Sequence, residues 1–275
     1  VSATAGRYFK ITPYTILGFR DANDNLTNQD SDYTQSDHYV IGIQHYLNPA
    51  ASISLEGFYK QYSDYPVSVL DEVSLANKGA DFEVLGNEDI ETIGKGRSYG
   101  LEFQYQQKLL NNFYSIFSYT YFFSEFTGFD TTTYIPSVWD SRHLISFVGG
   151  YKLKKNWEIS SRYRFAGQTP YVPTNLEATL ISYPEIILDY TRLGEEKLET
   201  FSQLDIRVDK KWNYNQFSLN IFFFVFNILG QSIPIHNEYG LSRDMSGNLT
   251  TPISLSLINQ DTSTSIPSIG IVVDF

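Results

Sequence analysis

Polar and apolar residues alternate along two stretches of this sequence, and this pattern limits the possible folds more than any other feature. In residues 97–109 every second side chain is apolar, with one interruption at Gln107. In residues 203–212 the alternation is broken only at Lys210. Successive side chains of a β-strand point to opposite faces, so both stretches are predicted to be strands with one apolar and one polar face.

The same alternation, with more interruptions, recurs through the rest of the chain. These weaker stretches comprise residues 5–9, 39–43, 53–59, 117–123, 145–153, 157–165, 217–225 and 269–275. With the two clear cases they make about ten strands, each close to the roughly ten residues with which a β-barrel strand crosses a bilayer. An all-β, antiparallel fold is therefore predicted.

The predicted connections between these strands are alternately short and long. The short ones comprise residues 48–50, 110–112, 154–156 and 213–215, and the long ones residues 21–37, 65–96, 128–141, 169–199 and 230–267. Outer-membrane β-barrels have tight periplasmic turns and long extracellular loops. The pattern predicts such a transmembrane barrel, and because the last strand follows a long connection, it places Phe275 at the periplasmic rim.

The composition agrees with a barrel and excludes membrane-spanning helices. Aromatic residues make up 16% of the chain, with 21 Tyr and 20 Phe, and such residues gather in the girdles of membrane barrels. No apolar run reaches the roughly 18 residues that a transmembrane helix needs, and the mean hydropathy is -0.25. A soluble repeat protein is disfavoured because the strand motifs show no fixed period. A soluble propeller or sandwich is less favoured because its apolar faces would pack inward and its long connections would not lie so regularly on one side.

Charge and cysteine content remove several classes of function. The 31 acidic and 20 basic residues give a net charge of -11, which opposes binding to the phosphate backbone of nucleic acids. The absence of Cys removes disulfides, thiolate metal sites and thiol nucleophiles. Nucleic acid is not an expected partner.

One group of adjacent residues resembles a catalytic constellation. Asp140, Ser141, Arg142 and His143 follow one another in the sequence. Strand alternation would place Ser141 and His143 on one side and the other two on the opposite side, which favours local hydrogen bonds at the start of a strand. No catalytic residue is therefore expected.

The acidic clusters of the long connections are the other candidates for chemistry. Those at residues 88–91 and 195–196 lack the spacing of a calcium-binding EF-hand loop and are interpreted as solvated charges. His236 would need metal ligands from elsewhere in the chain. Neither a metal ion nor a cofactor is expected.

Charged and amide residues on the polar side of the predicted strands are candidates for the barrel lumen. They are Glu102, Gln104, Glu158, Arg162, Arg164, Asp205, Arg207 and Asp209. In a polar lumen such residues pair with one another or contact a plug or a solute. Phe222, Phe224 and Phe226 depart from this polar pattern, which suggests that their part of the lumen packs against another element.

Aromatic residues in the long connections are candidates for binding a ligand. They are Tyr134, Trp139, Tyr171, Tyr183 and Tyr190. Their rings could stack on a sugar or on the rings of a metal chelate, or they could cover the mouth of the barrel. The sequence leaves both interpretations open.

Several motifs follow one another in a recognisable order. Residues 37–67 form a predicted hairpin, residues 94–126 open with G-R-x-Y-G-x-E and continue to S-Y-T-Y, and residues 139–173 open with D-x-R-H and reach G-x-x-P-Y. The chain closes with FFFVFNILGQ and IPSIGIVVDF. Over nearly the whole chain this series resembles the barrel of TonB-dependent transporters, particularly the Bacteroidota type.

The resemblance implies a part of a larger machine. The family barrel has about 22 strands around an N-terminal plug, so about ten strands without a plug or TonB box imply that residues 1–275 are the C-terminal portion of the barrel domain. The implied surroundings are outer-membrane lipid, the remaining strands, the plug, and the TonB complex acting through the plug. Outer loops would capture a scarce nutrient, which plug movement would import. Siderophore, cobalamin, glycan and peptide all remain open as the nutrient.

Two other functions remain open. The even strand count permits an autonomous ten-stranded barrel, which could be a surface protease of the omptin kind, although the catalytic constellation is missing. An adhesion or assembly protein could instead use its loops to hold a surface partner such as a lipoprotein. Sequence upstream of Val1 would discriminate among the three, because a plug there would establish the transporter.

Overall fold

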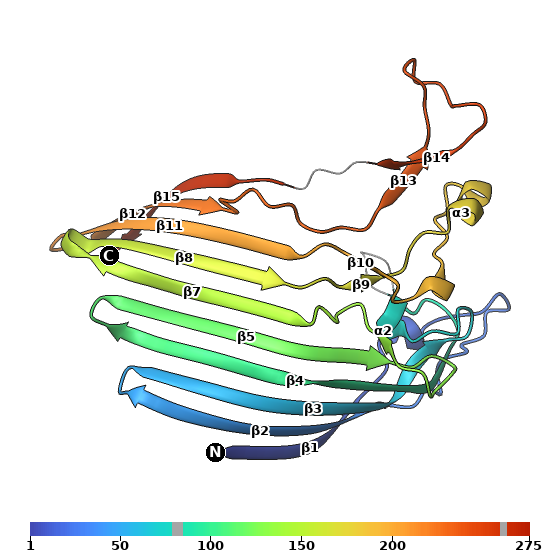
Figure 1. Ribbon diagram of the computed structural model, residues 1–275, viewed down its shortest axis with the longest axis horizontal. Coiled ribbons are helices and arrows are strands. Elements are labelled where there is room, and N and C mark those ends of the chain that lie inside the picture. The colour runs from blue at the N-terminus through green and yellow to red at the C-terminus, as the bar shows by residue number, and fades with distance from the viewer. Residues whose placement is uncertain (79–84, 259–262) are drawn as a thin grey trace.

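The chain forms one curved antiparallel sheet. The computed structural model describes residues 1–78, 85–258 and 263–275. Ten strands follow one another in the order β1-β2-β3-β4-β5-β7-β8-β11-β12-β15, and the short strand β6 pairs with β5 (Figure 1). Their bounds are Ser2–Lys10, Thr34–Asn48, Ala51–Ser68, Ile90–Leu110, Phe113–Phe126, His143–Leu153, Trp157–Ala166, Phe201–Asn213, Ser218–Phe226 and Ile266–Asp274, with β6 at Ile135–Pro136. The predicted all-β, antiparallel fold is confirmed.

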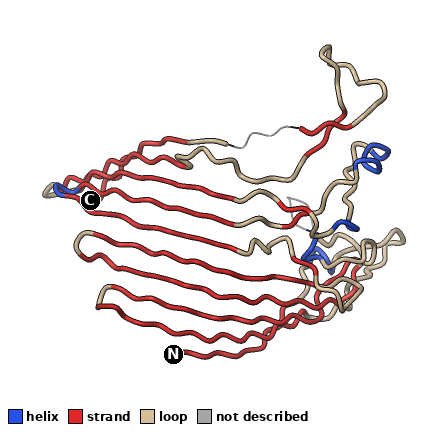
Figure 2. Tube along the Cα trace, viewed as in Figure 1, coloured by secondary structure: helices blue, strands red, loops and turns tan. Residues whose placement is uncertain are grey.

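Short and long connections lie at opposite ends of the strands. The tight turns gather at one end, together with the C-terminus, and the long connections gather at the other (Figures 1 and 2). Asn111 and Asn112, between β4 and β5, have φ angles of 49° and 67°, a left-handed conformation that Asn tolerates better than most residues. The alternation of connection lengths seen in the sequence therefore reflects the two ends of the sheet.

The long connections carry small elements of their own. The helices α1, α2 and α3 span Tyr14–Leu17, Leu75–Lys78 and Leu176–Ser182, and a 3-10 helix spans Tyr190–Arg192. Strand β9 (Pro170–Tyr171) pairs with β10 (Glu196–Lys197), and β13 (Glu238–Leu241) pairs with β14 (Leu255–Ile258). None of the helices within the described residues is long and apolar enough to cross a membrane.

The strand register separates an apolar from a polar face. Tyr105 pairs with Phe117, Phe117 with Phe147, Phe147 with Tyr163, and Tyr163 with Leu204. Residues paired across neighbouring strands lie on the same side of a sheet. These five side chains therefore form one apolar row that crosses five strands.

The polar row lies one residue away along each of the same strands. Gln104 pairs with Ser118, Ser118 with Ser146, Ser146 with Arg164, and Arg164 with Gln203. A shift of one residue moves a side chain to the other face. The two faces are thus opposite sides of one sheet, as the alternation predicts.

The apolar face is not covered by any described part of the chain. Ile41 and Ile269 are 62% and 75% exposed, whereas the small buried cluster of Ile16, Leu75 and Ile90 lies among the long connections. Apolar patches of this extent mark contact with a membrane or a partner. The packing core of this chain is therefore minor, and the main apolar surface faces outward from the sheet.

Candidate functional site

All eight residues predicted for the lumen lie on the polar face. The strand register places all of them on the same side of the sheet, from Glu102 on β4 to Asp209 on β11. Several of them pair with one another: within β11 the Arg207 guanidinium bonds both Asp209 oxygens at 2.7 and 2.8 Å, and across the strands Arg164 of β8 donates to Gln203 of β11 at 2.8 Å. The ring of Phe222 lies 3.8 Å from the Arg207 guanidinium carbon, so the apolar departure on β12 packs against a charge of the same face.

Asp205 accepts several hydrogen bonds on the polar face. Its carboxylate accepts hydrogen bonds from Arg162 Nε at 2.8 Å, from Gln203 Nε2 at 2.7 Å and from the backbone N–H of Asn227 at 2.9 Å. Only 2% of its side chain is exposed, against 44% for Arg162. A buried carboxylate with three hydrogen-bond donors needs no ligand to satisfy it. The Arg162 guanidinium is partly exposed, so Arg162 is the residue of this group that another molecule can reach.

A cleft of about 600 Å³ opens among the long connections. It lies at the end of the sheet opposite the tight turns, beside α2, α3 and the β9–β10 pair. Its polar and aromatic lining comprises Lys78, Glu88, Tyr171, Tyr190, Arg192, Glu196, His236, Glu238 and Tyr239. Pockets of this size accommodate small organic molecules.

Tyr171 organises one wall of the cleft. Its hydroxyl donates to Glu196, which also accepts from Arg192, and its ring stacks on His236 with centroids 5.3 Å apart. Burial and then the bond to Glu196 raise the pKa of Tyr171 to about 12, whereas the same bond lowers the pKa of Glu196. A second hollow, of about 470 Å³, also borders Tyr171 and His236. The stacked rings therefore lie between two hollows and offer an aromatic surface next to a charged pair.

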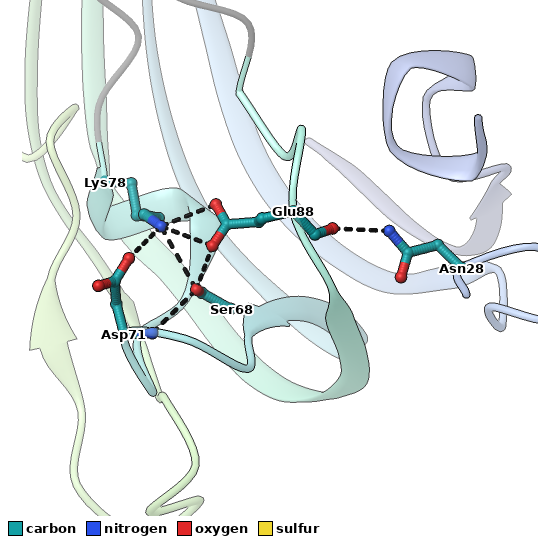
Figure 3. A network of polar contacts seen from close by, with 5 residues as sticks. All are labelled: Asn28, Ser68, Asp71, Lys78 and Glu88. Carbon is teal, nitrogen blue, oxygen red and sulfur yellow. Dashed lines mark hydrogen bonds and ion pairs between the residues drawn. The ribbon is translucent and has the colours of Figure 1, made fainter. Parts of the chain in front are cut away.

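A buried ion cluster supports the opposite wall. The Lys78 ammonium bonds both Glu88 oxygens at 2.7 and 2.8 Å and also contacts Asp71 and the Ser68 hydroxyl (Figure 3). Asn28 joins the cluster by donating to the Glu88 backbone carbonyl at 2.8 Å. The Lys78 side chain is 11% exposed. Removal of one partner of a buried pair leaves an uncompensated charge. This cluster therefore holds the β3–β4 connection together and joins it to the β1–β2 connection.

The structure brings together two of the five predicted loop aromatics. Tyr171 and Tyr190 line the cleft, and the Lys78 ammonium lies 5.2 Å from the Tyr190 ring. Tyr134, Trp139 and Tyr183 are absent from the lining. Trp139 and Tyr183 are instead 51% and 40% exposed.

Sequence reasoning missed the charged part of the cleft. The interpretation of the acidic clusters as solvated charges is wrong for Glu88, which is 18% exposed and paired with Lys78. It is incomplete for Glu196, which bonds Tyr171 and Arg192. Lys78 lies ten residues before Glu88 and Tyr171 lies 25 residues before Glu196, in connections without a regular period, so spacing did not reveal these pairs. Only Arg192, four residues before Glu196, has a spacing that could have suggested its ion pair.

The predicted local bonding around residues 140–143 has a counterpart in the structure. Asp140 is buried and forms an ion pair with Arg142 at 3.1 Å. The His143 Nδ1 atom lies 2.8 Å from the Tyr119 hydroxyl. Burial raises the pKa of Asp140, an effect that Arg142 opposes. Within the described ranges, no three His, Asp or Glu side chains are grouped as metal ligands.

Solved outer-membrane receptors share this fold at low sequence identity. The ferripyoverdine receptor of Pseudomonas aeruginosa, bound to ferripyoverdine, is 14% identical with a TM-score of 0.57, and the match covers 98% of this chain and 30% of the receptor. The ferric citrate transporter FecA, in its unliganded form, is 17% identical with a TM-score of 0.60, and the match covers 98% and 35%. The Escherichia coli outer membrane transporter YddB is 11% identical with a TM-score of 0.59, and the match covers 99% of this chain and 38% of the transporter.

These matches span about a third of each solved protein's length, and their identity shows the fold alone. No curated protein sequence matches the chain. The family profile described as "TonB dependent receptor-like, beta-barrel" matches residues 1–228, which include strands β1 to β12. The chain therefore belongs to the TonB dependent receptor-like β-barrel family.

Proposed function

We propose that residues 1–275 are the C-terminal portion of the barrel of a TonB-dependent outer-membrane transporter. The observation that carries this proposal is the open, two-faced sheet of a receptor-barrel family, with a cleft among its long connections. The apolar face would contact outer-membrane lipid and the polar face the lumen. The cleft would help to capture a scarce nutrient, which movement of the plug would then import.

The orientation and the partners follow from the same proposal. The C-terminus lies at the end with the tight turns, where Asp274 pairs with Ser218, and this supports a periplasmic position for Phe275. The plug would face Arg162 and the other polar-face residues, and the TonB complex would act through the plug. The motif series supports the Bacteroidota type, in which a surface lipoprotein would be a further partner at the long connections.

An enzymatic alternative finds no support in the family or in the shared fold. The matched structures are described as receptors and transporters. In the described register, β1 pairs only with β2 and β15 only with β12, so the two strands lie at opposite edges of the sheet. This arrangement does not favour an autonomous ten-stranded barrel.

Tyr171→Ala in the full-length receptor tests the capture site. Loss of the stacked ring and of the bond to Glu196 is expected to weaken uptake about tenfold, since an aromatic contact contributes about 0.5 to 1.5 kcal/mol beyond its buried area. Uptake of a panel comprising ferric citrate, cobalamin, an oligosaccharide and a peptide would be measured in cells with and without functional TonB.

The matched control for this substitution is Tyr183→Ala, because Tyr183 is exposed and outside the cleft. The proposal expects TonB-dependent uptake of a panel member, reduced by Tyr171→Ala and unchanged by Tyr183→Ala. Equal effects of the two variants would refute the cleft as the capture site. Uptake that is independent of TonB would refute the transporter itself.

The folding stability contributed by the cleft walls is expected to fall in two steps as the pH falls. Burial lowers the pKa of His236, so its stabilising effect is complete above its ordinary pKa of about 6.5 and is lost as the pH falls through the lowered value. The Tyr171 bond lowers the pKa of Glu196, so that contribution is lost only below the ordinary carboxyl pKa of about 4.3. Denaturant titrations of the full-length receptor across this pH range measure both steps. Persistence of the upper step in His236→Gln would contradict the assignment to His236.

A further inference from the structure

The apolar face contains a groove near the β1 edge. It has a volume of about 780 Å³ and extends from β1 to β5. Three small residues form its shallow part: Ala3, Ala5 and Gly57. Larger side chains surround them, and these are Tyr39, Ile41, Tyr59, Tyr99, Leu101, Tyr121 and Phe123. All of them share the apolar side, because the register pairs them across neighbouring strands.

Gly57 leaves the middle of the groove open. A Cβ atom built there would lie 3.5 Å from Leu101 Cδ2 and 3.8 Å from Ile41 Cγ2, which is ordinary van der Waals contact. Because Gly57 has no side chain, the space above it in the groove stays open. Since Ile41 and Leu101 are 62% and 55% exposed, no described segment fills the groove from above.

A row of charged residues borders the groove on the side of the long connections. Arg7 pairs with Asp37, Asp37 with Gln61, Gln61 with Arg97, and Arg97 with Glu125. This row is two residues along the strands from the aromatic row of Tyr39, Tyr59, Tyr99 and Phe123, a step of about 7 Å. Aromatic girdles mark the boundary between hydrocarbon and headgroups, so the charged row lies at headgroup depth.

The charged row presents its cations outward. The Arg7 side chain is 58% exposed against 20% for its partner Asp37, at 2.7 Å, and Arg97 is 38% exposed against 14% for Glu125, also at 2.7 Å. The Arg97 guanidinium is also held 4.2 Å from the Tyr134 ring. The carboxylates thus position the guanidinium groups and remain shielded behind them.

We propose that this groove is a binding site for a phosphorylated lipid of the outer leaflet. One acyl chain occupies the space over Gly57, and the phosphate lies against Arg7 and Arg97. The proposal rests on the orientation given under the proposed function, in which the long connections are extracellular. It is separate from nutrient capture, since the groove lies on the sheet, the cleft lies among the long connections, and the two share no lining residue.

Charge and shape together identify the ligand. Guanidinium groups bind phosphate through directed, charge-assisted hydrogen bonds, and a carboxylate hydrogen-bonded to the guanidinium group keeps its orientation fixed. Arg7 and Arg97 are three strand spacings apart, about 14 Å, so the row can engage a broad or doubly phosphorylated headgroup. An apolar groove inside the hydrocarbon region offers an acyl chain contacts that a smooth wall lacks.

Lipid retention by the full-length receptor tests the site. The receptor is purified from outer membranes in mild detergent, and bound phosphorylated lipid is counted by native mass spectrometry. Gly57→Leu fills the groove, and Arg7→Gln with Arg97→Gln removes the cations. Each change is expected to reduce retention at least fivefold. Ile159→Phe and Lys210→Gln are the matched controls, because both residues lie on the apolar face outside the groove.

The outcomes distinguish specific lipid binding in the groove from the general contact of the apolar face with the membrane. Loss of lipid in both test variants, with wild-type retention in both controls, supports the proposal. Equal retention in all variants refutes it, even if the apolar face is embedded in lipid and TonB-dependent uptake is intact. Displacement of the bound species by excess inorganic phosphate would also refute it, because the acyl chain must contribute to binding. Correct folding of each variant is checked by its heat-modifiable mobility on gels.

Discussion

Ile206→Arg is expected to destabilise the inserted barrel by about 2 to 4 kcal/mol, the cost of an arginine on the lipid face near the bilayer midplane. Ile206 lies within β11 and pairs with Ser161 and Val225 on the apolar face. At about 1.4 kcal/mol per factor of ten, the ratio of folded to unfolded protein falls roughly 30-fold or more. Urea titrations of the full-length receptor in lipid vesicles measure the effect.

The matched changes lie on the opposite face. Arg207→Leu, one residue along β11, should affect plug packing or conductance more than insertion, because Asn220 still donates to Asp209 at 2.9 Å. Glu102→Leu should also leave insertion intact, since Glu102 faces Glu56 across the strand pair and like charges in that position repel. An insertion defect as large as that of Ile206→Arg, from either change, would contradict the assignment of the two faces.

The sequence was sufficient to predict the strands because a period of two is a local property. Residues 97–109 and 203–212 fall within β4 and β11, and their alternation already specified which side chains share a face. The bounds were less accurate: the connection predicted at residues 65–96 is shorter, since β3 continues to Ser68 and β4 begins at Ile90. Mixed polar and small residues in those strand ends obscure the alternation.

The candidate sites could be predicted only in part, because they depend on contacts between distant segments. Tyr171 was identifiable as a loop aromatic, but its stack on His236 joins two separate connections, and its bond to Glu196 spans 25 residues of one irregular connection. The groove on the apolar face also depends on which distant segments the fold brings together. Gly57 is an unremarkable glycine in the sequence, and it becomes the floor of a groove only because the register sets it between Ile41 and Leu101.

The second large effect concerns residues 1–275 expressed without the rest of the proposed receptor. We expect no stable barrel, because β1 and β15, each of nine residues, are the unpaired edges of the sheet. In the hydrocarbon region each unsatisfied backbone group costs several kcal/mol. Under the proposed function, further strands of the receptor would pair with both edges, and the plug would cover the polar face.

Heat-modifiable mobility and protease resistance of this fragment, compared with the full-length receptor, test the central claim most directly. A Cys pair introduced at Ala5 of β1 and Ile271 of β15 reports whether the two edges meet. The proposal predicts that only the full-length receptor shows a compact, resistant species, and that the Cys pair forms no crosslink in either protein. A stable fragment monomer with β1 crosslinked to β15 would contradict it and would identify the chain as a small autonomous barrel.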